Sequence, residues 1–251
     1  MGRLTDKVAI VTGGAQGQGE AIVRAFVAEG ARVVIADVAK EPGAALADEL
    51  GDNAVFRHHD VTDEASWTTL VEETNERWGR VDVLVNNAGI LRFGQIDEMS
   101  LEEAELVWRV KQGGCFLGMK AVVPTMKAHG GGSIINASSV EGLGGMGSVA
   151  AYCGSKWAIR GMTKAVSHEL AARNIRVNSI HPGMIDTPMT QAHGGDLAME
   201  FGATKVPMRR VGKPVDVAGA YVFLASDESA YVTGAEIAVD GGVTATHAFG
   251  G

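Results

Sequence analysis

The sequence has few cysteines, prolines and aromatic residues. Its 251 residues include two cysteines and six prolines, and 6% of its side chains are aromatic. Two cysteines, Cys115 and Cys153, do not make a disulfide framework, so we expect both to be reduced thiols in a cytoplasmic protein. No group of Cys and His residues has the spacing of a zinc site, and we therefore expect no metal.

Long apolar runs and an excess of positive charge are also missing. No run reaches the ~18 residues that span a bilayer, and the N-terminus shows no secretory pattern. The net charge of −8 disfavours a nucleic-acid surface. We therefore expect neither a membrane nor a nucleic-acid partner. With 46% hydrophobic residues the chain can bury one large core, and we expect a single domain over residues 1–251.

Glycine is abundant, with 34 residues, and its most informative cluster is near the N-terminus. A short apolar strand at residues 7–11 leads into the glycine-rich turn at 12–19, and a helical pattern begins at Ala21. Glycines let the backbone approach a pyrophosphate at the N-terminus of a helix. A second strand at residues 31–36 ends at Asp37, whose carboxylate can bind a ribose 2′-hydroxyl and would repel a 2′-phosphate. Together these features predict NAD binding.

Tyr152 and Lys156 are four residues apart in a helical pattern, so their side chains lie one turn apart on one face. An ammonium group stabilises a neighbouring phenolate. Lowering a tyrosine pKa from about 10 by ~3 units takes roughly 4 kcal/mol, which we expect Lys156 to supply together with a cationic cofactor ring. Ser139 ends a predicted strand and can bond the same reacting oxygen. A Tyr and a Lys at this spacing are common on exposed helices, so the pair indicates a catalytic site only together with the dinucleotide motif.

Several motifs occur in the order seen in short-chain dehydrogenases/reductases: Thr12-Gly13-x-x-x-Gly17-x-Gly19, Asn86-Asn87-Ala88-Gly89, Ser139, Tyr152-x-x-x-Lys156 and Pro182-Gly183-x-x-x-Thr187. The resemblance covers nearly the whole chain. Residues 115–120, 179–184 and 233–242 carry a narrower resemblance to bacterial 3α(20β)-hydroxysteroid dehydrogenases.

Strands alternate with helices, which predicts a parallel sheet with right-handed crossovers. The resemblance implies an α/β, single-domain, Rossmann-type doubly wound sheet of about seven strands in the order 3-2-1-4-5-6-7, with helices on both faces. It also implies a homotetramer in which the helices at residues 100–128 and 150–172 pair with their symmetry mates.

The resemblance further assigns roles to residues of the site. Tyr152 would exchange the proton, Lys156 would bind the nicotinamide ribose, and Ser139 would hold the substrate oxygen. Asp60 would accept a hydrogen bond from the adenine amine, or cap a helix, or do both. The residues implied to bind the cofactor are Gly13, Gln16, Gly17, Gln18, Gly19, Asp37, Asp60, Val61, Asn87, Ala88, Gly89, Tyr152, Lys156, Pro182, Gly183, Ile185 and Thr187.

The segment from Met189 to Val211 has weak periodicity and two adjacent glycines, as expected of a mobile substrate lid. Methionines suit bulky apolar ligands, although they also fill cores. Glu141 and His193 are either polar pocket residues or solvated. The candidate substrate residues are Glu141, Met146, Met184, Met189, His193, Met199 and Phe201.

These features favour an NAD(H)-dependent oxidoreductase that interconverts a secondary alcohol and a ketone, with a bulky apolar or steroid-like substrate. One alternative is a β-ketoacyl thioester reductase, which Asp37 disfavours because such family members usually take NADPH. The other is a dinucleotide-binding protein without turnover. That alternative stays open because Lys111 stands where the family commonly has a catalytic Asn.

In the family, that Asn holds a kink whose main-chain carbonyl binds a water on the proton path from the lysine. The main-chain carbonyl at this position is present whichever side chain the residue carries. We expect Lys111 to point outward, because an unpaired buried ammonium is costly. Pointed inward, it would bring a second cation near Lys156 and depress the pKa of both lysines. We therefore expect an active enzyme in which Lys111→Asn raises kcat or leaves it nearly unchanged.

Overall fold

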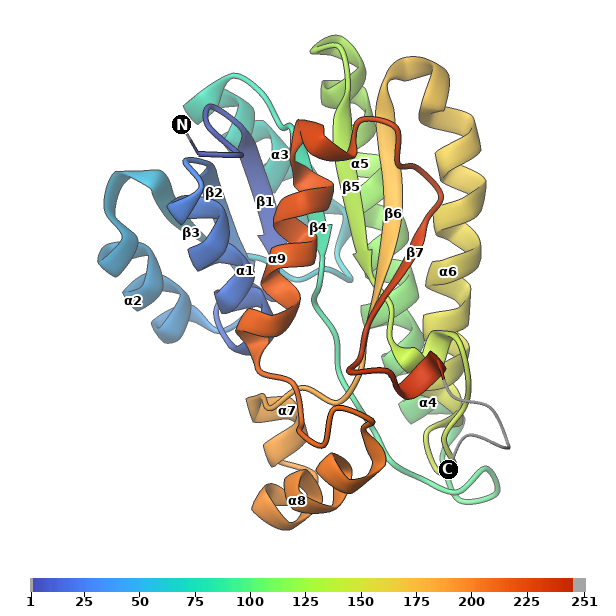
Figure 1. The fold of residues 1–251 in the computed structure, drawn as a ribbon. Helices are drawn as coiled ribbons and strands as arrows, with labels where there is room; N and C mark the ends of the chain where they lie inside the picture. The colour runs from blue at the N-terminus through green and yellow to red at the C-terminus, as the bar shows by residue number, and fades with distance from the viewer. Residues whose placement is uncertain (1, 246–251) are drawn as a thin grey trace.

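A seven-stranded parallel sheet runs through the centre of the computed structural model, which describes residues 2–245 (Figure 1). The strand order β3-β2-β1-β4-β5-β6-β7 confirms the expected fold class and order. The strands are β1 (Val8–Thr12), β2 (Arg32–Asp37), β3 (Ala54–His58), β4 (Val83–Asn86), β5 (Gly132–Ala137), β6 (Ile175–Pro182) and β7 (Glu236–Val239).

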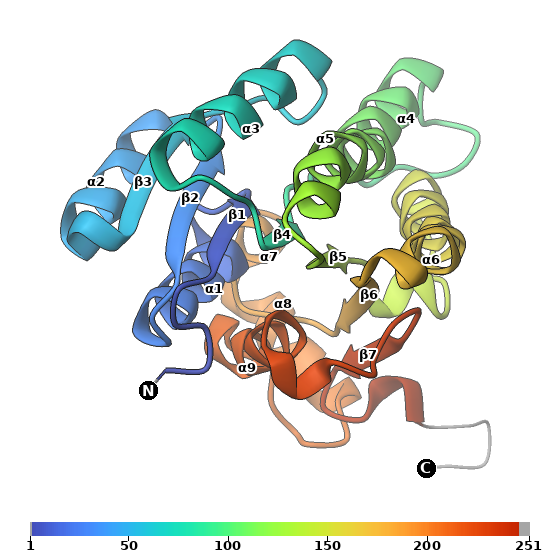
Figure 2. The ribbon, with the colours of Figure 1, turned by 90° about the horizontal axis from the view of Figure 1, so that it is seen from above.

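Helices cover both faces of this sheet, as Figure 2 shows from above. On one face lie α1 (Gly17–Ala28), α2 (Lys40–Leu50) and α9 (Pro214–Ala225). On the other lie α3 (Glu64–Trp78), α5 (Gly114–Ala128) and α6 (Ala150–Leu170), with α4 (Leu101–Trp108) packed against α6. Successive strand residues belong to opposite cores, since Val11 joins the first cluster and Ile10 the second. With both faces covered, the central strands are almost continuously apolar.

The segment between residues 100 and 128 differs from the single helix expected from its pattern. A capping box of Ser100 and Glu103 opens α4. A π-helical turn, Arg109–Gly113, then separates α4 from α5. Such a turn inserts an extra residue and shifts every later side chain around the helix axis. Phe116, which follows this turn in α5, is accordingly 54% exposed.

The segment after β6 forms two helices, α7 (Pro188–Gln191) and α8 (Gly195–Lys205), beyond the carboxyl ends of the strands (Figure 1). Its two ends meet, because Ile185 and Gly212 form an isolated parallel bridge. Around that bridge Asp186 N donates to Gly212 O at 2.8 Å, and Gly212 N donates to Met184 O at 3.0 Å. Short 3-10 helices complete the fold at Gly51–Asn53, Val140–Gly142, Ala171–Arg173, Asp227–Ser229 and Val243–Ala245.

Within residues 2–245, none of the helices has both the length and the apolar character needed to cross a membrane.

Candidate active site

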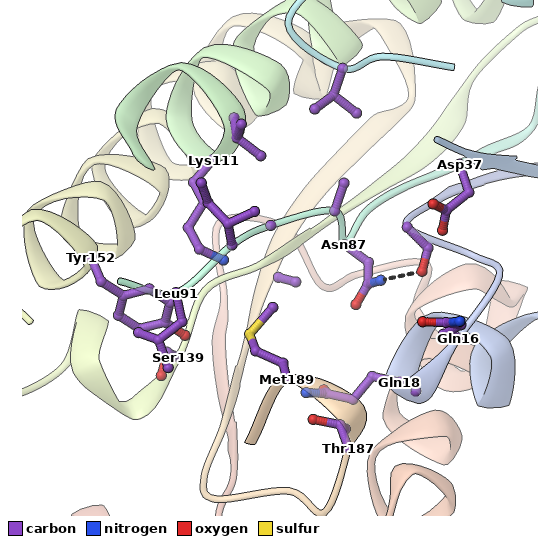
Figure 3. A pocket seen from close by; sticks show the side chains of 18 of the residues that line it. Gln16, Gln18, Asp37, Asn87, Leu91, Lys111, Ser139, Tyr152, Thr187 and Met189 are labelled. Atoms are coloured by element: carbon purple, nitrogen blue, oxygen red, sulfur yellow. Dashed lines mark hydrogen bonds between the residues drawn. The ribbon is translucent and has the colours of Figure 1, made fainter. Parts of the chain in front are cut away.

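A cavity of about 530 Å³ opens at the carboxyl ends of the central strands. Its wall comes from the turns after the first six strands, from α4 and the π-helical turn, and from the first turns of α6 and α7. Figure 3 shows Asp37 and Tyr152 on opposite sides of this cavity. One elongated cavity therefore contains the residues predicted for dinucleotide binding and those predicted for proton transfer. Among residues 2–245, no three His, Cys, Asp or Glu side chains are arranged to hold a metal ion.

Asp37 is fixed at the end of β2 by two main-chain donors. Its Oδ2 accepts from Ala15 N and its Oδ1 from Ala39 N, both at 3.0 Å. Gly13 has a φ of +61°, and a Cβ there would lie 2.9 Å from Ala88 Cα. The turn thus needs glycine and leaves a narrow cradle between α1 and the end of β4. The residues around this cradle fit the phosphates and ribose of a dinucleotide.

Gly19 has a structural role in the glycine turn. It does not line the cavity, and a Cβ there would overlap the carbonyl oxygen of Gly13. Its lack of a side chain lets α1 lie directly under the turn.

Asn87 joins the glycine turn to the end of β4. Its Nδ2 donates to the carbonyl oxygens of Thr12 and Gly13, both at 3.1 Å. Asn87, Ala88 and Gly89 all line the cavity, as the motif predicts. The amide of Asn87 thereby has a structural function beside any contact with a ligand.

The remaining residues predicted to bind the cofactor also line the cavity. One interpretation of Asp60 is wrong, because α3 is capped by Asp63, whose Oδ1 accepts from Ala65 N at 2.9 Å. Asp60 Oδ1 instead accepts from the amide and hydroxyl of Thr62, at 2.9 and 2.8 Å. The other residues in this group are Gln16, Gly17, Gln18, Val61, Pro182, Gly183, Ile185 and Thr187.

Ser139 and Tyr152 both line the other end of the cavity. The Ser139 hydroxyl accepts from Glu141 N at 3.2 Å. Behind it, Nδ1 of the fully buried His181 donates to Ser139 O at 2.9 Å. Nε2 of His181 accepts from the Ser179 hydroxyl, also at 2.9 Å. Burial lowers the pKa of His181, so this imidazole stays neutral and holds the Ser139 backbone.

The pKa of Tyr152 differs from the expectation for the isolated Tyr–Lys pair. Burial of the phenol raises its pKa to about 12, and the hydrogen bond from Ser139 acts in the opposite direction. Desolvation is therefore the dominant influence on this phenol in the protein alone. A stronger positive charge in the cavity is needed to make this tyrosine a proton acceptor near neutral pH.

Lys156 is 3% exposed, and its Nζ donates to Ala137 O at 2.5 Å. Its Nζ lies 5.5 Å from the centre of the Tyr152 ring. Burial lowers the pKa of Lys156 to about 8. The ammonium is thus held in the cavity by a main-chain carbonyl of β5.

The expected outward position of Lys111 is wrong. Its side chain is 4% exposed, lines the cavity, and places Nζ 4.8 Å from the centre of the Tyr152 ring (Figure 3). The π-helical turn carries Lys111, and the missing side chain of Gly89 leaves the space that Nζ occupies. The outward position was expected because burying an unpaired, charged ammonium costs free energy. Burial and the nearby Lys156 lower the pKa of Lys111 well below its usual value, which favours the neutral amine and reduces that cost.

Of the candidate substrate residues, only Met189 lines the cavity. Met184 contacts α8 beside Gly202, and Glu141 Oε2 accepts from the Cys153 thiol at 3.6 Å. His193 lies against Phe93, with 5.2 Å between ring centres. Residue type had suggested these positions, but it does not fix which way a side chain points. The others outside the cavity wall are Met146, Met199 and Phe201.

An apolar part of the cavity wall was not predicted from the sequence. These residues are Ile90, Leu91, Leu106 and Val110. Ile90 and Leu91 directly follow the Asn-Asn-Ala-Gly motif, and Leu106 and Val110 are four residues apart before Lys111. Their short distance along the chain from the Asn-Asn-Ala-Gly motif or from Lys111 was the signal that could have identified them.

Comparison with known proteins places these features in a family. The model of a family described as enoyl-(acyl carrier protein) reductase matches residues 13–244. A 3-alpha-(or 20-beta)-hydroxysteroid dehydrogenase from Mycobacterium tuberculosis is 49% identical over 97% of this chain and 92% of that protein. A trans-4-hydroxycyclohexanecarboxylate dehydrogenase from Sinomonas cyclohexanicum is 44% identical, over 97% and 95%. An NADP-dependent (R)-specific alcohol dehydrogenase from Lentilactobacillus kefiri is also 44% identical, over 97% and 98%. The chain therefore belongs to the short-chain dehydrogenase/reductase family, whose oxidoreductases act on alcohol groups.

Proposed function

We propose that this protein is an NAD(H)-dependent oxidoreductase that interconverts a secondary alcohol and a ketone. The observation that carries the proposal is the Ser139–Tyr152 pair, which shares one cavity with Asp37 and the glycine turn. A hydroxyl donor beside a buried phenol is suited to hold and protonate one oxygen atom of a substrate.

The bound nicotinamide dinucleotide would supply the site that accepts or donates the hydride and a positive charge in its oxidised form. In alcohol oxidation Ser139 orients the substrate oxygen, and Tyr152 takes the hydroxyl proton. In ketone reduction Tyr152 returns that proton to the oxygen. Lys156, held by Ala137 O, keeps a positive charge beside the phenol and favours its ionised form.

Asp37 supports a preference for NAD over NADP. Both of its carboxylate oxygens accept main-chain hydrogen bonds, so its negative charge is fixed at the end of β2. The following residues, Val38 and Ala39, carry no positive charge. A 2′-phosphate would meet a fixed anion without a counter-charge beside it. The relative from Lentilactobacillus kefiri uses NADP, so relatives of this similarity differ in cofactor.

The apolar wall near the lysines favours a bulky, apolar, cyclic substrate. Leu91, Leu106 and Val110 line the cavity together with Met189, which α7 supplies. Two of the relatives are named for hydroxysteroids and for a hydroxycyclohexane carboxylate, which are cyclic alcohols. Residues 189–211, which carry α7 and α8, act as the substrate lid in this proposal.

The test measures each class of substrate with each of the two cofactors. Hydroxysteroids, cyclohexanols and β-hydroxyacyl thioesters are each incubated with NAD and NADP, and the kcat/KM values are compared. We expect the highest values for a cyclic secondary alcohol with NAD. Equal values with the two cofactors would remove the NAD preference, and a best value for the thioester would favour the alternative reductase.

Tyr152→Phe is the control variant, because it keeps the ring and removes the exchangeable proton. We expect no turnover from it and an unchanged Kd for NADH by fluorescence. NADH binding without turnover by the wild-type protein, over the whole panel, would instead indicate a dinucleotide-binding protein.

The assembly proposed is a homotetramer. Phe116 on α5 and Trp157 on α6 expose large apolar side chains on the helices expected to pair between subunits. Light scattering at micromolar concentration tests this assembly, and a monomer mass would contradict it.

A further inference from the structure

The indole of Trp67 on α3 holds one residue of the cavity wall by its main chain. Trp67 is 1% exposed, and its Nε1 donates to Val61 O at 3.0 Å. Buried indole N–H groups usually find an acceptor, and this acceptor belongs to the turn after β3. That turn lines the cavity next to Asp37, because His59 N donates to Asp37 O at 3.0 Å. A side chain outside the cavity thus fixes the wall at its dinucleotide end.

The amide of Val61 has no acceptor within residues 2–245, although Val61 is buried and lines the cavity. The amides that follow it are bound. Thr62 N donates to Asp60 Oδ1 at 2.9 Å, and Asp63 N donates to Asp60 O at 3.1 Å. A buried main-chain N–H without a partner costs free energy. A ligand in the cavity can supply the missing acceptor.

Asp60 presents an acceptor beside this donor. Its Oδ1 binds the amide and hydroxyl of Thr62, whereas no donor among residues 2–245 binds its Oδ2. An acceptor and a donor on adjacent residues match the edge of adenine, where an exocyclic amine lies beside a ring nitrogen with a lone pair. Asp60 is already expected to accept from that amine, and Val61 N is then the donor for the ring nitrogen.

The indole of Trp67 is itself held from the side of β3. The His59 ring meets it edge to face, with ring centres 4.3 Å apart and an interplanar angle of 77°. Nδ1 of His59 bonds to the Ser66 hydroxyl at 2.8 Å, which fixes the imidazole to α3. The donor to Val61 O therefore has a fixed direction before any ligand binds.

Two glycines of α5, which packs against α3, leave room for this contact (Figure 2). A Cβ at Gly118 would lie 2.7 Å from Trp67 Cη2, and a Cβ at Gly114 would lie 2.9 Å from Val61 Cβ. Glycine weakens the interior of a helix. The helix thus carries two unfavourable residues where Trp67 and Val61 approach it.

We propose that Trp67 is a positioning residue for the adenine half of the cofactor. Through Val61 it sets how strongly the site prefers adenine to hypoxanthine, the deaminated base. Hypoxanthine has a carbonyl oxygen in place of the amine and a hydrogen on the adjacent ring nitrogen. It would place an acceptor against Asp60 and a donor against Val61 N. This inference rests on the proposed function, which supplies the dinucleotide.

The first test measures the Kd values of ADP and of inosine diphosphate by calorimetry, with the full chain. Trp67→Phe keeps an aromatic ring and removes the indole donor. We expect the wild type to bind ADP at least about tenfold more tightly, because a mismatched base leaves polar groups unpaired. In Trp67→Phe the Kd of ADP should rise about tenfold, the scale of a lost buried hydrogen bond, and that of inosine diphosphate should change less.

Steady-state kinetics with NAD separates positioning from a general loss of structure. Trp67 does not line the cavity, so the KM for NAD should rise in Trp67→Phe while kcat at saturating NAD stays within about twofold. Trp78→Phe is the matched control, because Trp78 ends the same helix and its indole forms no hydrogen bond within the described residues. A fall in kcat with an unchanged KM and an unchanged preference for ADP overturns the proposal.

The second test needs no variant at Trp67. The four indole groups of the wild type are labelled with ¹⁵N, and the signal of Trp67 is identified by replacing the other three tryptophans singly with Phe. Saturation with ADP should shift the Trp67 indole signal. Nicotinamide mononucleotide, which lacks adenine, should leave that signal in place. A Trp67 signal that ADP does not move contradicts the proposal.

Both binding tests are independent of turnover. A wild type that binds neither NADH nor ADP would overturn the proposed function, and this inference with it. A wild type that binds NADH but holds ADP and inosine diphosphate equally would overturn the inference alone.

Discussion

The buried ammonium of Lys156 should make the stability of the folded protein depend on pH in an unusual direction. Its pKa is about 8 in the folded protein against 10.5 for a free lysine. Below pH 8 both states are protonated, and the full cost of burying the charge is present. Between the two pKa values the unfolded chain holds a proton that the folded protein has lost, so the free energy of unfolding rises with pH.

The size of this effect follows from the shift. Each pH unit in this interval adds about 1.4 kcal/mol, so Lys156 contributes roughly 3 kcal/mol between pH 8 and pH 10. Cys115 and Cys153 also titrate there, because burial raises the pKa of both thiols, and they lower the stability with rising pH. A comparison with Lys156→Met removes their contribution, since both thiols remain in the variant. Lys111 also remains, and burial is the largest cause of its lowered pKa.

The assay is urea unfolding followed by circular dichroism from about pH 6 to about pH 10, at one fixed protein concentration. We expect the variant to be more stable at low pH by an amount that stays constant up to pH 8. Above that pH the two stabilities should converge by about 1.4 kcal/mol per unit. A difference that stayed constant through the whole range would show that Lys156 has an ordinary pKa, and would refute the reasoning.

Three further outcomes test the site. His181→Leu removes the donor to Ser139 O; we expect a stability loss of about 1–3 kcal/mol and a fall in kcat with little change in NADH affinity, measured by steady-state kinetics and fluorescence. Gly89→Ala should displace the Lys111 amine and lower kcat, whereas in a Lys111→Asn background the same substitution should cost less, which a double-mutant cycle measures. Gly19→Ala should destabilise the fold by about 1–3 kcal/mol in urea unfolding, because a main-chain oxygen of the turn lies where the methyl would be.

The sheet and the ends of its strands could be predicted from the sequence because backbone requirements leave clear signals. The turn at Gly13 needs a positive φ and close contact with Ala88, and only glycine meets both conditions. Asp37, Asn87 and Tyr152 each follow a strand or begin a helix, where neighbouring residues fix the direction of the chain. Such positions can be located by motif and spacing alone.

The directions of the side chains outside these motifs could not be predicted, for two physical reasons. The π-helical turn has no signature in the apolar spacing, and it rotates Lys111 into the cavity and Phe116 out of the core. Lys111 was also expected to point outward because its charge was taken as fixed, whereas burial lowers the pKa of an amine and favours its neutral form. Met184 and Met146 were chosen by chemical type, and their directions depend on how α8 and the loop after β5 lie.

The bridge between Ile185 and Gly212 has a consequence for how this protein can diversify. It brings the two ends of residues 187–211 together, so the chain enters and leaves α7 and α8 at one point. The free energy of closing such a loop changes slowly with its length. A segment of another length or composition could therefore be inserted there while β6 and α9 stay in place. If residues 189–211 are the substrate lid, as proposed, substrate range can change within this segment while the strands that carry the glycine turn, Asp37 and Ser139 stay the same.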